Sequence, residues 1–271
     1  MANDLIKNPE FEKLVSHVQE LESELASLVC DRDVLIYHTC PALKAEYMLK
    51  LGKLEYAIYE YQCKIRRTKR KIEIIRSFKN RDQSYNIVKI DEQLDKEYEE
   101  YTQKLLEKQK EIDDARDRIS NERPLTKEES SEIKKLYTQI VKKLHPDINS
   151  NTTEEERRQF SDAVEAYKKG DLAELRVISL LSEKTSFTSF TKTTNSMDIL
   201  KTKKEMLLKQ KKKLADKIQE IKNTFPYNIR NLLLNKIALE NKIDDLSDLL
   251  NISREQYKEA ENKLEAIQKE N

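Results

Sequence analysis

Apolar residues recur in steps of four and three along five long stretches of the chain, the spacing that keeps one stripe on one side of an α-helix. Each stripe covers two positions in seven, so such a helix buries little by itself and needs a second helix along its length. A helix over residues 43–78 would be about 50 Å long, too long to be held inside a compact domain. We therefore expect an all-α protein with elongated coiled-coil or helical-hairpin arms. The five stripes run through residues 14–35, 47–75, 94–119, 200–221 and 239–267.

Glycine is scarce, and this excludes several classes of catalytic site. Only two of the 271 residues are glycine, Gly52 and Gly170, whereas 37% of the residues are charged. Two glycines so far apart cannot form either of the common phosphate-binding patterns, G-x-G-x-x-G or G-x-x-x-x-G-K-[ST]. Because this composition is typical of long helices, we expect no enzyme activity and no cofactor.

Charge and cysteine content narrow the choice of partner and compartment. The formal net charge is +1, so no global field indicates nucleic acid or a membrane. No apolar run approaches the roughly 18 residues of a membrane span, and the N-terminus lacks the apolar core of a signal peptide. Cys30, Cys40 and Cys63 show no C-x-x-C spacing, which favours reduced thiols in a cytoplasmic protein. His38 and Cys40 could supply two metal ligands, but no second pair lies nearby, and we expect no metal site.

Breaks in the helical pattern divide the chain into regions. The chain is expected to turn back at Pro41, at residues 80–86 and at Phe225-Pro226, and the last break predicts an antiparallel hairpin of the final two helices. Whether the arms pair within one chain or between two chains of a homodimer stays open. The predicted regions are an N-terminal long-helix coiled-coil region (1–121), a small helical module (122–183), a Ser/Thr-rich linker (184–197) and a C-terminal antiparallel helical hairpin (198–271).

The module differs from the arms because its elements are short, with caps and stops in quick succession. Thr126 and Glu129 match the capping-box pattern at a helix start. That helix is expected to end at Leu144, because Pro146 disfavours helical geometry in the residue before it. Thr152 or Thr153 is expected to open a second helix, and Gly170 is expected to end it. Asp171 is expected to cap a third helix.

His145-Pro146-Asp147 lies in the loop between two helices of the module that must be antiparallel. Pro146 stiffens this loop, so we expect the His145 imidazole and the Asp147 carboxylate to project into solvent. The stretch 132–147, EIKKLYTQIVKKLHPD, resembles without a gap the second helix and H-P-D loop of the J-domain (DnaJ-like) family. The next helix is similar to the third helix of that family at Phe160, Val164, Ala166 and Tyr167.

The resemblance implies a co-chaperone, which binds a DnaK-type heat-shock chaperone and stimulates its ATP hydrolysis. In that family the H-P-D loop carries the stimulation, and a basic face of the preceding helix docks on the acidic partner. Clustered lysines attract an acidic surface over long range and mainly raise the association rate. The resemblance assigns these roles here to His145, Pro146, Asp147, Lys134, Lys135, Lys142 and Lys143.

The resemblance is confined to residues 126–181 and lacks the first helix of the family. We expect the end of the third long helix, or the short helix after Gly170, to cover the apolar face of the module in its place. The Gly/Phe-rich and cysteine-rich modules of larger members are also missing. The coiled-coil arms are therefore expected to bind a client or scaffold protein and to choose where the module acts.

Two other functions remain as alternatives. In the first, the chain is a coiled-coil scaffold or adaptor whose J-like module serves only packing. A buried, internally bonded loop favours this scaffold, whereas exposure of His145 and Asp147 favours the co-chaperone. In the second, the basic tract 64–81 binds nucleic acid, which predicts one continuous uncompensated basic face. We favour pairing of this tract with the acidic stretch 91–100 on the next helix, and a similar origin for the lysines of 201–213.

Overall fold

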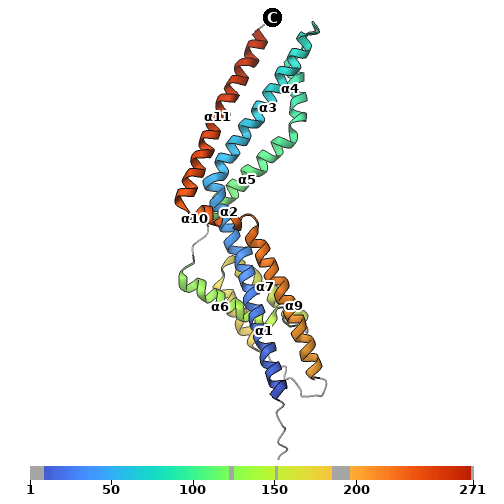
Figure 1. The fold of residues 1–271 in the computed structure, drawn as a ribbon, viewed down its shortest axis with the longest axis vertical. Coiled ribbons are helices and arrows are strands. Elements are labelled where there is room, and N and C mark those ends of the chain that lie inside the picture. Colours follow the sequence, from blue (N-terminus) through green and yellow to red (C-terminus); the bar gives the residue numbers. More distant parts are fainter. Residues whose placement is uncertain (1–8, 122–124, 150–151, 185–195, 270–271) are drawn as a thin grey trace, which may run out of the picture. The chain divides into compact units, whose positions relative to one another are not determined.

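The structure of the chain, a computed structural model, describes residues 9–121, 125–149, 152–184 and 196–269. These residues are almost all helical and include no β-strand, which confirms the predicted all-α class. Residues 185–195 of the predicted linker lie outside the described part. The helical segments in Figure 1 are α1 (Pro9–Val34), η1 (Leu35–Thr39), α2 (Cys40–Tyr47), η2 (Met48–Gly52), α3 (Lys53–Lys79), α4 (Ile87–Glu97), α5 (Glu99–Asn121), α6 (Lys127–Leu144), α7 (Glu154–Lys169), α8 (Leu172–Lys184), α9 (Ser196–Asn223), η3 (Tyr227–Ile229), α10 (Arg230–Leu234) and α11 (Lys236–Lys269).

The helices group into two compact units, each assembled from distant parts of the sequence. Unit 1 comprises Met1–Pro41 and Arg123–Asn228, and unit 2 comprises Ala42–Glu122 and Ile229–Asn271. Unit 1 therefore contains α1 and α6 to α9, whereas unit 2 contains α3 to α5, α10 and α11. The region predicted as one N-terminal coiled coil, 1–121, contributes to both units.

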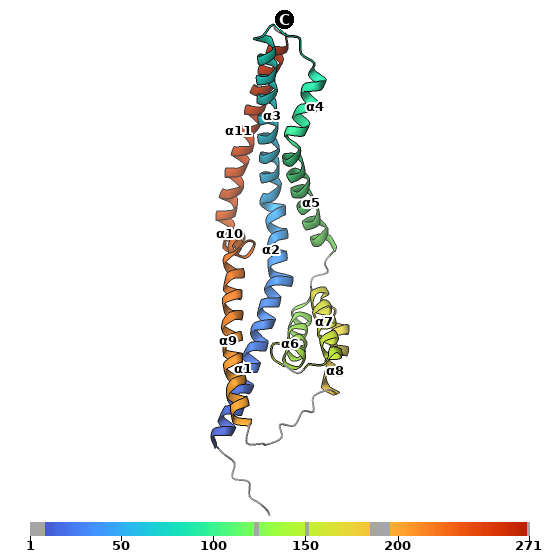
Figure 2. The same ribbon diagram turned by 90° about the vertical axis from the view of Figure 1, so that its right-hand side faces the viewer.

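Each unit is built on a pair of long helices that run in the same direction. In unit 1, α1 packs along α9, and in unit 2, α3 packs along α11 (Figures 1 and 2). The predicted antiparallel hairpin over 198–271 is therefore not formed, because α9 and α11 belong to different units. A narrow apolar stripe can pack against any similar stripe, parallel or antiparallel. The long stretches of chain between α1 and α9, and between α3 and α11, allow the parallel arrangement.

Pro41 does not break the helix, contrary to the prediction. It lies in α2, directly after the π-helical turn η1, in which the Cys40 N–H donates to the Leu35 carbonyl oxygen. A π-helical turn shifts the hydrogen-bond register by one residue. The missing N–H of Pro41 thus falls where the helical ladder is already rearranged, and helical structure continues through α2.

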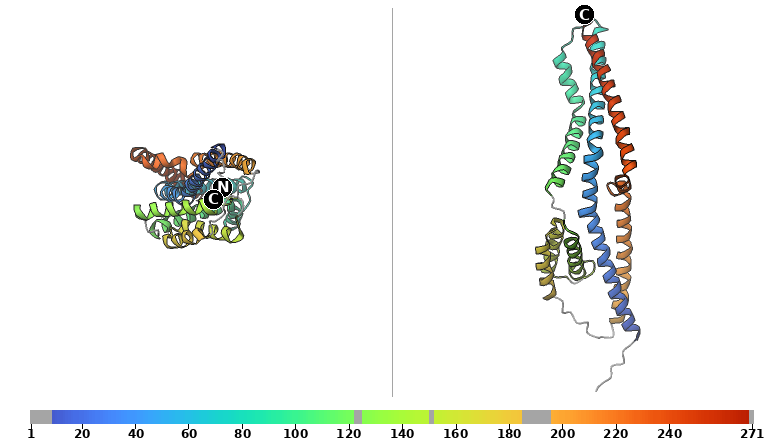
Figure 3. Two further views of the ribbon diagram at one scale, coloured as in Figure 1. Left: turned by 90° about the horizontal axis from the view of Figure 1, so that it is seen from below. Right: turned by 90° about the vertical axis from the view of Figure 1, so that its left-hand side faces the viewer.

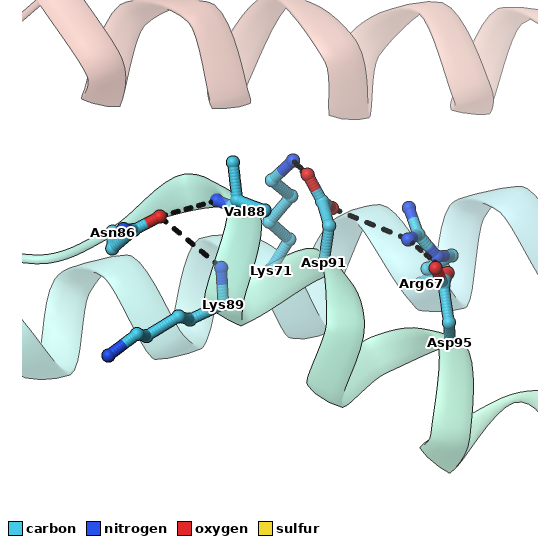
Figure 4. A network of polar contacts seen from close by, with 7 residues as sticks. All are labelled: Arg67, Lys71, Asn86, Val88, Lys89, Asp91 and Asp95. Atoms are coloured by element: carbon cyan, nitrogen blue, oxygen red, sulfur yellow. Dashed lines mark hydrogen bonds and ion pairs between the residues drawn. The ribbon is translucent and has the colours of Figure 1, made fainter.

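The predicted break at 80–86 is confirmed, and the chain reverses there. The side-chain oxygen of Asn86 accepts hydrogen bonds from the backbone N–H of Val88, at 2.9 Å, and of Lys89, at 3.3 Å, and so opens α4 (Figure 4). Helices α4 and α5 then pack back along α3 in unit 2. The core at this end of unit 2, where α4 and α11 flank α3 (Figure 3, right), consists of Ile72, Ile75, Ile90, Leu94 and Ile267.

This reversal pairs three residues of the basic tract, Arg67, Arg70 and Lys71, with acids of α4, which bears out the favoured pairing for that part of the tract. Arg67 lies 2.7 Å from Asp95 and 3.3 Å from Asp91, and Lys71 lies 2.8 Å from Asp91 (Figure 4). A further pair joins Arg70 to Glu97. The lysines of α9 follow the same rule in unit 1, where Lys203 pairs with Glu22 and Lys211 with Glu24 of α1, each at 2.6 Å.

Candidate protein-binding site at the His145-Pro146-Asp147 loop

Local hydrogen bonds define the two helices that carry the loop. Thr126 and Glu129 form the predicted capping box of α6, and Thr153 opens α7 with a second one. Helix α6 ends at Leu144, and the side-chain nitrogen of Asn149 donates to the carbonyl oxygens of Lys142 and Lys143 at its C-terminal end. At the far end of α7, Gly170 adopts the left-handed conformation with φ 67° and stops the helix as predicted.

His145 is buried, contrary to the prediction that its imidazole projects into solvent. Only 6% of its surface is exposed, and its ring meets Phe160 of α7 edge to face, with 5.0 Å between the ring centroids. Its Nδ1 atom accepts a hydrogen bond from the backbone N–H of Asp147 at 3.0 Å. The reason is helical register, because His145 follows Tyr137 and Val141 at steps of four on the buried stripe of α6. That spacing was present in the sequence.

Burial keeps the imidazole neutral. Loss of solvent is the main cause that lowers the pKa of His145, and the charge of Arg32 lowers it further, against the opposing effects of Asp147 and Asp33. Since Nδ1 is the acceptor in the bond from Asp147, the proton of the neutral ring is assigned to Nε2.

The buried imidazole should make folding stability depend on pH. Between the lowered pKa of folded His145 and about 6.5 for an unfolded histidine, the unfolded chain binds more protons, so stability falls as pH decreases through this window. In His145→Gln the amide oxygen can still accept the Asp147 N–H, but no titrating ring remains. We expect the wild type to lose more stability than this variant between about pH 7.5 and about pH 5 in urea unfolding. Equal losses would contradict a lowered pKa of His145.

The rest of the loop is presented to solvent. Pro146 and Asp147 are exposed, whereas Ile148 is buried and anchors the chain behind them. The Asp147 carboxylate has no hydrogen-bond or ion-pair partner in the described part of the chain. The two side chains thus point to different functions. Asp147 is exposed, which favours the co-chaperone, whereas His145 is buried and bonded within the loop, which favours the scaffold.

The four predicted docking lysines do not form one face. Lys135 and Lys142 are exposed seven positions apart on α6, with Gln139 between them, and both are without an ion-pair partner among the described residues. Lys134 instead points to α1, where its Nζ lies 3.1 Å from Asp31. Lys143 is half-buried beside the Asn149 cap. The free positive charge next to the loop therefore comes from Lys135 and Lys142.

Two helices cover the α6–α7 pair, and sequence reasoning identified one of them. Helix α8, which follows Gly170, packs on both α6 and α7 (Figure 2), and Arg176 of α8 binds Glu132 of α6 through two bonds of 2.8 Å. The second is α1. The alternative considered above, the end of the third long helix (α5), belongs to unit 2. The apolar pattern did not distinguish α1 from the other four stripes.

The contact with α1 brings in residues that sequence reasoning missed. Asp33 of α1 is buried and accepts a hydrogen bond from the Tyr137 hydroxyl at 2.7 Å. Tyr137 stacks on Tyr167 of α7, with 4.0 Å between ring centroids and an angle of 14°. A charged residue on the α1 stripe, Arg32, was the only hint, since a charge on a seam needs a buried partner.

The described residues hold no group of three or more His, Cys, Asp or Glu side chains able to bind a metal ion. None of the described helices combines the length and apolar character that a membrane crossing requires. Cys30, Cys40 and Cys63 are free thiols. Compared with protein-family models, with curated proteins and with solved structures, the chain matches none of them.

Proposed function

We propose that this protein is a co-chaperone, which binds a DnaK-type heat-shock chaperone through the H-P-D loop and stimulates its ATP hydrolysis. The observation that carries the proposal is the exposure of Pro146 and Asp147 at the turn between α6 and α7, together with the unpaired Lys142 near the end of α6 and Lys135 two turns before it. A stiff loop with one free carboxylate can accept hydrogen bonds from a partner, and the lysines attract an acidic surface. The protein has no catalytic residues in this proposal, and its helical arms bind the client or the scaffold.

His145 has an internal role in this proposal. Its ring is packed on Phe160, and its Nδ1 holds the Asp147 backbone N–H at 3.0 Å. A side chain bonded in this way restricts the loop and fixes the direction of the Asp147 carboxylate, which reduces the entropy lost on binding. Of the three H-P-D residues, Asp147 makes the charged contact with the chaperone.

A coiled-coil scaffold is the second candidate, and the burial of His145 favours it. In a scaffold the α6–α7 pair packs on α1 and α8 and binds no chaperone. The two functions differ in what Asp147 does. Its charge is essential to a co-chaperone and dispensable to a scaffold, since the carboxylate makes no hydrogen bond or ion pair with a described residue.

The test is single-turnover ATP hydrolysis by the DnaK-type chaperone of the same organism, with this protein added. We expect stimulation by the wild type and its loss, down to the rate of the chaperone alone, in Asp147→Asn. The matched control is Asp162→Asn, which removes the same charge from an exposed position on α7 and should stimulate like the wild type.

Each outcome of this assay decides between the two functions. Full stimulation by Asp147→Asn would overturn the assigned role of the loop. If the wild type gives no stimulation of a chaperone that responds to another J-protein, the co-chaperone function is wrong and the scaffold remains.

A further inference from the structure

An ion pair of α1 with a buried carboxylate contacts the middle of α6. Asp33 is only 1% exposed, and its Oδ1 atom lies 2.7 Å from Nε and 2.6 Å from Nη2 of Arg32. Its Oδ2 atom accepts the hydroxyl of Tyr137 on α6 at 2.7 Å. Both carboxylate oxygens are thus used, as a buried charge requires.

The carboxylate also governs the state of Tyr137. Burial, followed by the charge of Asp33 and its hydrogen bond, raises the pKa of Tyr137, so the phenol stays protonated and keeps donating. Movement of either group would leave a charge or a hydroxyl unpaired in the interior, which is costly. The Arg32, Asp33 and Tyr137 side chains therefore form one rigid cluster between α1 and α6.

A second contact joins the same part of the chain to α7. Tyr167 of α7 stacks on Tyr137 and also meets the His38 ring of η1 edge to face, with 4.9 Å between centroids. Lys168 lies 4.9 Å from the ring centroid of Tyr37 in the same turn. Residues 31–38 thus contact both helices that carry the loop.

The cluster acts electrostatically on the loop. Tyr137 and His145 lie on one stripe of α6, two steps of four apart. The charges that act on the imidazole are Arg32 and Asp33 of α1 and Asp147 of the loop, whereas α7 contributes the uncharged ring of Phe160. Arg32 opposes a positive charge on His145 and Asp33 favours one. Both charges act in addition to burial, which is the main cause of the lowered pKa of His145.

We propose that Asp33 is a positioning residue for the H-P-D loop, and that α1 thereby regulates the presentation of Asp147 to the partner. The functional part rests on the co-chaperone function proposed above. Asp33 acts through its ion pair with Arg32 and its hydrogen bond with Tyr137. Helix α1 thus stands in for the missing first helix of the module and also links the loop to an arm of the protein.

The experiment is a titration of the His145 side chain by heteronuclear NMR in the full chain, with hydrogen exchange of the Asp147 amide as second readout. Asp33→Asn leaves Arg32 unbalanced, so the pKa of His145 should fall further below that of the wild type. Arg32→Gln should raise it. In Asp33→Asn the Asp147 amide should exchange at least about tenfold faster, because a 1.4 kcal/mol loss of loop closure corresponds to that factor. The matched control is Glu20→Gln, the loss of an exposed acid on the same helix that has no ion pair with α6 in the described part of the chain, which should change neither readout.

Opposite shifts of the His145 pKa separate a positioning role from a merely structural one. If the cluster were only structural, both substitutions would loosen it and shift the pKa of His145 in the same direction. Shifts of equal sign, or none beyond the control, overturn the proposal. If Asp33→Asn does not fold, Arg32→Gln alone decides, since no upward shift in that variant also overturns it.

The chaperone assay then tells the two proposals apart. Opposite pKa shifts without stimulation by the wild type would support the positioning role of Asp33 and overturn the co-chaperone function. Stimulation that survives in a well-folded Asp33→Asn, without a shift, would support the co-chaperone and overturn the role of Asp33.

Discussion

Replacement of Tyr137 by alanine is expected to destabilise unit 1 by about 3–5 kcal/mol, the range for removal of a large buried aromatic ring. Tyr137 is fully buried, stacks on Tyr167 and donates its hydroxyl to the buried carboxylate of Asp33. The alanine variant loses the packing of the ring and also removes a donor from a buried charge. Amide hydrogen exchange in α6 and α7 measures this loss directly, since a chain of two units need not unfold in a single step.

Tyr137→Phe separates the two contributions. Phenylalanine keeps the stack on Tyr167 and removes only the hydroxyl, so this variant should lose about 1–3 kcal/mol, the cost of an unsatisfied buried polar group. A loss of less than about 1 kcal/mol in Tyr137→Ala would contradict the position of this ring in the core.

Replacement of Ile75 by alanine is expected to destabilise unit 2 by about 2–5 kcal/mol. Ile75 is fully buried in α3 and packs in one cluster with Ile90 and Leu94 of α4 and Ile267 of α11. The residual cavity would lie where α3, α4 and α11 meet, and none of these helices can move into it without displacing the other two. The expected result is faster amide exchange throughout α3 and α4.

The control for this prediction is the same substitution at an exposed site of unit 2. Ile252 of α11 is 54% exposed, and Ile252→Ala should change stability by no more than about 0.5 kcal/mol. If both variants lose the same amount, the cluster around Ile75 is not the core of this unit.

The loop illustrates how one site can be half predictable from sequence. The hairpin, its caps and the exposure of Pro146 and Asp147 follow from local patterns. The direction of His145 does not follow from the stiffness of Pro146. It follows from the register of α6, because a residue four positions after Val141 faces the same side. Phe160, on the next helix, then supplies the surface that covers the imidazole.

The sequence by itself determined the helical class, the capping box at Thr126, a helix start at Thr152 or Thr153, the stop at Gly170 and the reversal before Asn86. Each depends on groups within about four residues of one another, so no distant partner is needed. Only the tertiary structure decided that α1 pairs with α9, that α3 pairs with α11, and that Asp33 binds Tyr137 of the module. Five apolar stripes of similar width and spacing can pair in many ways with similar burial. The choice among these pairings depends on long-range contacts such as Asp33–Tyr137 and Lys203–Glu22, which no local pattern encodes.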